Sequence, residues 1–236
     1  MEMLEVLFVR HGKPYYSQKE LEEGIIEGTL REEGTRQVKE AASEIVTIAK
    51  RREQTLMLIV HSPRRRARES AALITDALKN AGIETQMYMC KELRDVSFSG
   101  AFLDQQYSDV IAGRTSWDRW MEYWMNFGTY DSKTDSPEQV SGRAVRVLNR
   151  LMDLASRQVF QRRNVIVVVV GHEEGVRDLL LKALNMRTEL GQGQAYAEKV
   201  LVTIRIDKAR NEADLKVEFR GQYAHLKLAA KGCSTL

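Results

Sequence analysis

The chain has 236 residues, 43% apolar and 29% charged, a balance typical of a globular protein with a sizeable core. Its 36 basic and 33 acidic side chains leave a net charge of only +3, too mild to require a nucleic-acid or membrane partner. Since no apolar stretch approaches the roughly 18 residues needed to cross a bilayer and no signal segment precedes the first strand, we expect one cytoplasmic domain, 1–236, with its two cysteines reduced.

Two strands and two helices are predicted in the first third of the chain. Apolar runs at residues 4–9 and 56–60 are typical of buried strands. Apolar residues recur at helical spacing over residues 38–49, and again from just after Pro63 to near Gly82. Strands that alternate with helices imply βαβ units and a mostly parallel sheet.

The second half of the chain repeats this alternation and ends differently. An apolar stripe at residues 140–154 predicts a helix, residues 165–170 a buried strand and residues 176–184 a further helix. Residues 200–206 and 215–219 alternate apolar with polar side chains, which predicts an antiparallel hairpin at the margin of the sheet. The fold class expected is therefore α/β, a three-layer sandwich whose mostly parallel central sheet is flanked by helices.

Residues 97–136, between the two halves, have a different character. Trp117, Trp120 and Trp124 fall at helical spacing within this segment. The spacing predicts a helical insertion, which either packs its aromatic face onto the core or forms a lid over the pocket.

Histidines follow two of the predicted strands. The first strand leads into Arg10-His11, and the strand at residues 165–170 leads into His172. Parallel strands present their carboxyl ends at one edge of a sheet, where such sheets bind ligands, so we expect both histidines to meet there. An unprotonated imidazole nitrogen can take a phosphoryl group, and a guanidinium fork binds its oxygens. The pattern therefore predicts a site for a phosphoryl group.

A third motif, at residues 60–71, adds a family resemblance to these two. It contains Ser62-Pro63 and the pair Arg66-Ala67. Together with the early Arg-His-Gly and the late Gly-His, it resembles the histidine phosphatase superfamily, the phosphoglycerate-mutase-like fold, whose middle motif runs Ser-Pro-Leu-x-Arg-Ala-x-Gln-Thr-Ala. This chain has arginine in place of the leucine and Glu-Ser in place of Gln-Thr. The matches run in the family's order from residue 4 to about residue 180.

The resemblance implies a metal-independent phosphatase that hydrolyses a phosphomonoester through a phosphohistidine. It makes His11 the nucleophile, and it assigns the phosphoryl oxygens to Arg10, Arg66 and His172. The helix expected after Pro63 adds backbone donors and a positive dipole end. No metal or other cofactor is expected, because the histidines lack a cysteine or carboxylate cluster at ligand spacing. The expected partner is a small phosphorylated molecule.

The leaving oxygen of a phosphomonoester needs a proton, which a carboxyl group of suitable pKa can supply. Residues 91–98 resemble the family's Leu-x-Glu stretch, which places Asp95 at the acid position, with Glu92 as the alternative. Glu173 stands where the family often has a small residue, and it is a further candidate to face the substrate. Ser17 lies six residues after the nucleophile, where related mutases carry asparagine, and this favours a phosphatase over a mutase.

Other functions stay open beside the phosphatase. One is a phosphoglycerate-type mutase, and another is a low-turnover module that binds a phosphorylated ligand. The arginines at positions 64–66 and 68 also invite a nucleic-acid interpretation, but Glu69 follows them and the chain is nearly balanced in charge, so no nucleic-acid partner is expected. The sequence leaves the natural substrate and the oligomeric state open.

Overall fold

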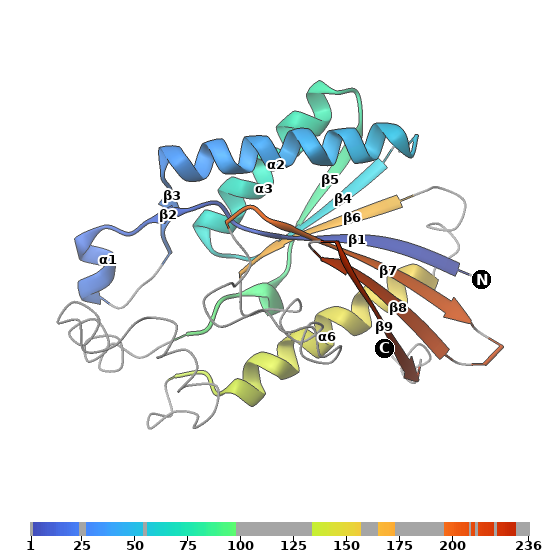
Figure 1. Ribbon diagram of the computed structural model, residues 1–236. Coiled ribbons are helices and arrows are strands. Elements are labelled where there is room, and N and C mark those ends of the chain that lie inside the picture. The colour runs from blue at the N-terminus through green and yellow to red at the C-terminus, as the bar shows by residue number, and fades with distance from the viewer. Residues whose placement is uncertain are drawn as a thin grey trace.

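The computed structural model describes residues 2–23, 27–53, 56–97, 134–156, 165–172, 196–207, 209–210, 212–219 and 221–229. Within them, a seven-stranded sheet with the order β5-β4-β6-β1-β7-β8-β9 lies between α2 and α3 on one face and α6 on the other (Figure 1). The strands of this sheet are β1 (Glu2–Arg10), β4 (Leu56–His61), β5 (Glu84–Met89), β6 (Val165–Gly171), β7 (Lys199–Asp207), β8 (Glu212–Phe219) and β9 (Gln222–Ala229). The other elements are α1 (Gln18–Glu23), α2 (Glu32–Arg51), α3 (Arg65–Asn80), η1 (Lys91–Leu93), α6 (Pro137–Ser156) and a small sheet of β2 (Pro14–Tyr15) with β3 (Thr29–Leu30).

The sheet combines a parallel part with an antiparallel part. The strands β5, β4, β6 and β1 pair in parallel, whereas β7, β8 and β9 continue from β1 in antiparallel pairs. This arrangement confirms the predicted α/β class with helices on both faces and antiparallel strands at the C-terminal margin. The predicted hairpin is confirmed as β7 and β8, and the helices predicted around residues 38–49, 64–81 and 140–154 are confirmed as α2, α3 and α6.

Two strands of the seven-stranded sheet, β5 and β9, are not predicted from the sequence, and neither are the two-residue strands β2 and β3 of the small sheet. The strands β5 and β9 each lie at an edge of the seven-stranded sheet, where one side of the strand has no neighbour in the strand order. Met87, Tyr88 and Met89 of β5 are all about half exposed, so no alternation of apolar and polar residues marks this strand. These two edge strands are therefore the ones in the seven-stranded sheet that the hydrophobic core constrains least.

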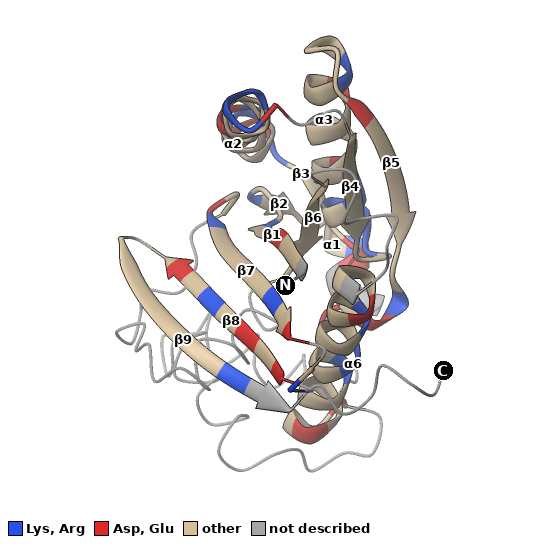
Figure 2. Ribbon diagram, turned by 90° about the vertical axis from the view of Figure 1, so that its right-hand side faces the viewer, with Lys and Arg blue, Asp and Glu red and all other residues tan. Residues whose placement is uncertain are grey.

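Alternating side chains of β1 divide the core into two layers, as Figure 2 shows with α2 and α3 on one side of this strand and α6 on the other. Leu4, Val6 and Phe8 belong to the layer that contains α6, and Leu7 and Val9 belong to the layer of α2 and α3. The strand β6 is buried on both faces, which explains its unbroken apolar sequence. The two layers hold the carboxyl ends of β1, β6 and β4 side by side.

The chain leaves β1 in direct contact with the start of α2. A Cβ atom added at Gly12 would lie 2.4 Å from the carbonyl oxygen of Gly34, and one added at Gly34 would lie 2.2 Å from that of Lys13. Only glycine fits at these two positions, because main chain packs on main chain. The Gly12 N–H also donates to the hydroxyl of Ser70 on α3 at 3.2 Å. The residue before it, His11, is therefore carried by a tightly held segment.

Several predictions fall on residues that the structure does not describe. They are the helix at residues 176–184, Glu173 and most of the insertion at residues 97–136. The single-domain organisation over residues 1–236 also stays a prediction. None of the helices in the described ranges combines the length and the apolar character needed to cross a membrane.

Candidate active site

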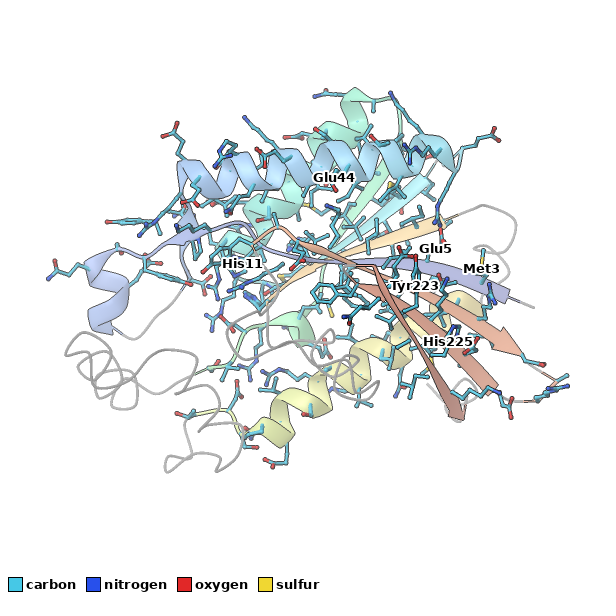
Figure 3. The ribbon with its side chains drawn as sticks, in the orientation of Figure 1. Met3, Glu5, His11, Glu44, Tyr223 and His225 are labelled. Atoms are coloured by element: carbon cyan, nitrogen blue, oxygen red, sulfur yellow. The ribbon has the colours of Figure 1, made fainter. Side chains whose placement is uncertain are left out.

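Three neighbouring strands deliver side chains to one edge of the sheet. His11 directly follows β1, His172 directly follows β6, and Ser62 directly follows β4. Figure 3 places His11 at the carboxyl end of its strand. Backbone hydrogen bonds extend the sheet to this point, since the His11 N–H donates to the Gly171 carbonyl and the Ser62 N–H to that of Val170, both at 3.0 Å. The rings of His11 and His172 lie 5.1 Å apart, edge to face, as the strand pattern predicted.

The hydrogen bonds of His11 determine which ring nitrogen carries its proton. The Nδ1 atom lies 2.8 Å from the Gly12 carbonyl oxygen, which can only accept, so Nδ1 holds the hydrogen. The Nε2 atom is then unprotonated, and it accepts a hydrogen bond from Nε of Arg66 at 3.1 Å. Burial, followed by the nearby His172 and Arg66, lowers the pKa of His11 well below its usual value. His11 is therefore a neutral imidazole with an available lone pair on Nε2.

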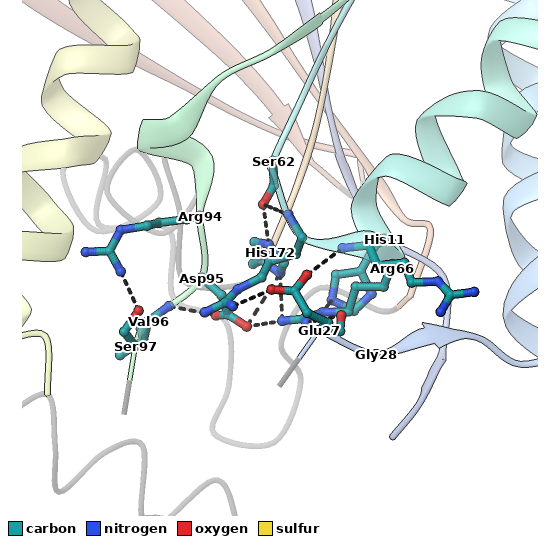
Figure 4. Close-up of polar contacts among 12 residues, drawn as sticks. His11, Glu27, Gly28, Ser62, Arg66, Arg94, Asp95, Val96, Ser97 and His172 are labelled. Atoms are coloured by element: carbon teal, nitrogen blue, oxygen red, sulfur yellow. Dashed lines mark hydrogen bonds and ion pairs between the residues drawn. The ribbon is translucent and has the colours of Figure 1, made fainter. Parts of the chain in front are cut away.

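Arg66, in the first turn of α3, is the centre of the cluster and is 1% exposed. Besides its bond to His11, its Nη1 donates to the Glu27 carbonyl at 2.8 Å, and its Nη2 contacts both the Asp95 carboxylate and Nδ1 of His172, the latter at 3.2 Å (Figure 4). One planar guanidinium thus contacts His11, Asp95 and His172, three side chains that the sequence predicts at the site. This planar, fixed fork suits the oxygens of a phosphoryl group.

Ser62 and Arg66 together fix the ring of His172. Because the Arg66 guanidinium can only donate, Nδ1 of His172 accepts, and its Nε2–H then points to the Ser62 hydroxyl at 2.8 Å. The same hydroxyl accepts from the Arg64 N–H at 3.2 Å, where the chain enters α3. Burial lowers the pKa of His172 to about 3, an effect that the neighbouring Asp95 only partly offsets. His172 is therefore uncharged at neutral pH.

Asp95 lies beside both Arg66 and His172. Its Oδ2 contacts the Arg66 guanidinium and lies 3.7 Å from Nδ1 of His172, and its Oδ1 accepts from the Val96 N–H at 2.8 Å. Burial by itself raises the pKa of Asp95, but the nearby His172 and Arg66 lower that pKa by more. Since His172 is uncharged at neutral pH, the positive charge of Arg66 keeps Asp95 ionised.

Arg10 lies next to an aromatic ring that the sequence analysis did not select. Its guanidinium stacks 4.1 Å from the ring centroid of Tyr196, and the same ring lies 5.8 Å from that of His11. Tyr196 precedes β7, so it reaches the site only because β7 pairs with β1. A single aromatic residue ahead of a strand carries no signal of such a role in the sequence.

Glu27 closes one side of the cluster and was likewise missed. Its carboxylate accepts from Nη1 of Arg64 at 2.8 Å and from the Arg65 N–H at 3.0 Å, while its backbone carbonyl accepts from Arg66. The chain therefore places its own anion at the beginning of α3, where the free N–H groups and the helix dipole favour negative charge.

Glu92 and Ser17 are engaged elsewhere. The Glu92 carboxylate accepts from Nη1 of Arg150 on α6 at 2.9 Å. Ser17 and Glu20 form a reciprocal capping box at the start of α1, in which the Ser17 N–H donates to the Glu20 carboxylate at 2.9 Å and the Glu20 N–H donates to the Ser17 hydroxyl at 3.2 Å. Of the two carboxylates considered as the acid, Asp95 is thus the one that the structure brings to the histidines. Among the described residues, no group of three His, Cys, Asp or Glu side chains could hold a metal ion.

The two buried histidines are expected to make the fold sensitive to mild acid. The pKa values of His11 and His172 lie below the usual 6.5 in the folded protein, so below that pH the unfolded chain binds protons that the folded chain does not. Each histidine should then lower the free energy of unfolding by about 1.4 kcal/mol per pH unit as the pH falls below about 6. Urea denaturation between about pH 7 and pH 5 measures this slope, and His172→Asn should make it shallower. An unchanged slope in that variant would contradict the expectation.

The family model of the histidine phosphatase superfamily (branch 1) matches residues 6–217. The chain belongs to that superfamily. No curated protein sequence matches this histidine phosphatase superfamily member.

Solved structures with a similar fold include several phosphatases. Mycobacterial hydrolase 2 has a TM-score of 0.62 and 19% identity, with 96% of this chain and 94% of that one covered. A mycobacterial glucosyl-3-phosphoglycerate phosphatase has a TM-score of 0.57 and 18% identity, covering 86% and 91% of the two chains. A phosphoserine phosphatase from Entamoeba histolytica has a TM-score of 0.53 and 14% identity, covering 86% and 90%. At these identities the likeness shows that the histidine phosphatase superfamily member shares their fold.

Proposed function

We propose that the protein is a metal-independent phosphatase that hydrolyses a phosphomonoester through a phosphohistidine on His11. The observation that carries the proposal is the unprotonated Nε2 of His11, held beside the buried Arg66 guanidinium that also contacts His172 and Asp95. A neutral imidazole is a competent nucleophile only where cations hold the phosphoryl oxygens. The proposal is supported further by membership of the superfamily and by structural neighbours that are named phosphatases.

In the first step, the lone pair on Nε2 of His11 forms a bond to phosphorus while the bond from phosphorus to the ester oxygen breaks. The guanidinium of Arg66 turns its Nε–H from His11 to a phosphoryl oxygen, and Arg10 binds another. The Ser62 hydroxyl keeps the His172 ring in place beside the same group. The electron pair of the broken bond goes to the ester oxygen, which takes a proton from Asp95.

Asp95 must gain that proton, although the Arg66 guanidinium beside it favours the ionised carboxylate. A substrate phosphate carries negative charge to Arg66 and replaces the carboxylate there. Loss of the cationic partner and the arrival of an anion both raise the pKa of Asp95, so phosphate binding and protonation of Asp95 are coupled. Binding of the substrate thus favours the protonated form of Asp95, which the first step requires.

In the second step, water attacks the phosphorus of the phosphohistidine and gives its proton to the Asp95 carboxylate. The bond from nitrogen to phosphorus breaks, the lone pair returns to Nε2 of His11, and inorganic phosphate is released. The substrate class that we propose is a small phosphorylated molecule, which agrees with the small phosphorylated compounds in the names of two structural neighbours.

A trapping experiment separates this phosphatase from a module that only binds a phosphorylated ligand. The protein is mixed with p-nitrophenyl phosphate labelled in the phosphoryl group, in the presence of EDTA, and denatured in alkaline detergent. Label should accumulate on the chain, survive alkali and be lost in acid, as a phosphohistidine is. A labelled chain that resists acid, or hydrolysis that proceeds without any labelled chain, would contradict the covalent mechanism.

A further inference from the structure

The segment that carries Asp95 has no regular secondary structure of its own. It follows the short helix η1, and residues 94–97 belong to no helix or strand. The backbone of such a segment is not held by the hydrogen bonds of a helix or sheet, so its conformation depends on side-chain contacts. A carboxylate that must protonate a leaving oxygen needs an anchor here, because a misplacement of about 1 Å can cost roughly 100-fold in rate.

Asp135 supplies contacts on both sides of Asp95. Its buried carboxylate accepts from Nη1 and Nη2 of Arg94 at 2.8 and 2.9 Å, and from the Ser97 N–H at 2.7 Å. Its own N–H donates to the Ser97 carbonyl at 2.8 Å. Arg94, directly before Asp95, and Ser97, two residues after it, are therefore both bound to Asp135, which lies just ahead of α6.

Arg143, in the second turn of α6, completes the anchor. It is 6% exposed, its Nη1 and Nη2 lie 3.2 and 3.3 Å from the Asp135 carboxylate, and its Nη2 also donates to the Asp95 carbonyl at 3.5 Å. Although burial opposes it, hydrogen bonds from Arg94 and Ser97 and the charge of Arg143 lower the pKa of Asp135. The Asp135 carboxylate therefore stays ionised at the pH values where Asp95 would exchange its proton.

Resting on the proposed function, we infer that Asp135 is a positioning residue, which acts through Arg94, Ser97 and Arg143 to aim Asp95 at the leaving oxygen. Its contacts with Arg94, Ser97 and Arg143 all act on residues 94–97, the segment that carries the acid. Its loss should therefore impair protonation of the leaving group far more than binding of the phosphate.

A series of aryl phosphates whose leaving phenols differ in acidity, from p-nitrophenyl to phenyl phosphate, tests the inference. A good leaving group departs with little protonation, whereas phenol depends on the acid. Asp135→Asn should lower kcat for phenyl phosphate about 10-fold more than kcat for p-nitrophenyl phosphate, with little change in KM. Asp95→Asn should steepen the same dependence, and the double variant should be no steeper than Asp95→Asn alone.

Arg150→Gln is the matched control. It removes the ion pair between Arg150 and Glu92, which joins the same helix α6 to η1 just ahead of Asp95 but does not touch residues 94–97. This variant should keep the leaving-group dependence of the wild type. If Asp135→Asn proves unstable in thermal unfolding, Arg94→Gln removes the two donors to Asp135 together with the bond from Arg94 to the Ser97 hydroxyl, and it should show a weaker steepening of the same kind.

The outcomes separate the inference from the function on which it rests. If Asp95→Asn steepens the dependence while Asp135→Asn and Arg94→Gln match the wild type, the positioning role is overturned and the phosphatase mechanism stands. If Asp95→Asn itself leaves the dependence unchanged, the proposed acid is wrong. An equal loss on every ester in Asp135→Asn would indicate a structural residue only.

Discussion

Replacement of His11 by alanine is expected to reduce hydrolysis of p-nitrophenyl phosphate by about 10⁴-fold or more, because the proposed reaction has no other nucleophile. The release of p-nitrophenol in EDTA measures the effect, and the variant should also fail to retain label in the trapping experiment. The side chain lies at the end of β1, against main chain that glycines keep in close contact, and its removal takes away little of the apolar core.

His61 offers a control of the same kind. It is also buried, as the last residue of the apolar strand β4, and its Nδ1 lies 2.8 Å from the carbonyl oxygen of the following residue, as in His11. His61→Asn should keep most of the activity, since the ring of His61 bonds to the neighbouring Ser62 carbonyl and not to Arg66. Hydrolysis that persists in His11→Ala at near the wild-type rate would remove His11 from the mechanism and leave the fold assignment untouched.

Substitution of Arg66 by lysine is expected to lower kcat/KM by about 10³-fold although the positive charge is kept. A lysine has one nitrogen and cannot reach His11, Glu27 and Asp95 at once, so the phosphoryl oxygens lose their planar clamp and Asp95 loses its counter-ion. Inhibition by inorganic phosphate should weaken along with the rate.

Arg68 is the comparison on the same helix. Its side chain is exposed on α3, so Arg68→Lys should leave kcat/KM within a few-fold of the wild type. A similar loss in both variants would assign the effect to the charge or the stability of α3 rather than to the fork of Arg66. Thermal unfolding of both proteins distinguishes these two causes.

The sequence predicts the parts of the fold in which side-chain pattern and burial coincide. Residues 4–9 of β1, apart from Glu5, and the strand β6 are apolar because both faces of each are covered. The histidines that follow them meet because the two strands pair in parallel. The apolar stripe that predicts α2 begins only at Val38, after Gly34, whereas the helix begins at Glu32, because its first turn is acidic and contributes nothing to the stripe. Pattern alone also misses edge strands, which the core does not cover.

The candidate site could be predicted only where a residue adjoins a strand or a motif. Asp95 and Glu92 lie only three residues apart, and the sequence around them does not tell their roles apart. The short helix η1 ends between them, so that Asp95 contacts Arg66 whereas Glu92 pairs with Arg150 of α6. Tyr196, Glu27 and Asp135 reach the site from distant segments. Their contacts exist only in three dimensions, so no local spacing announces them.

The contact between Gly12 and Gly34 limits how this protein can diverge. Since a methyl group at either position would collide with carbonyl oxygens, the start of α2 and the residues after β1 cannot drift apart or be remodelled one at a time. New specificities would have to arise around a fixed reaction centre, by changes in segments that approach it from outside. Directed evolution of this protein should accordingly tolerate many substitutions in the segments around the histidines, and it should accept almost no residue other than glycine at positions 12 and 34.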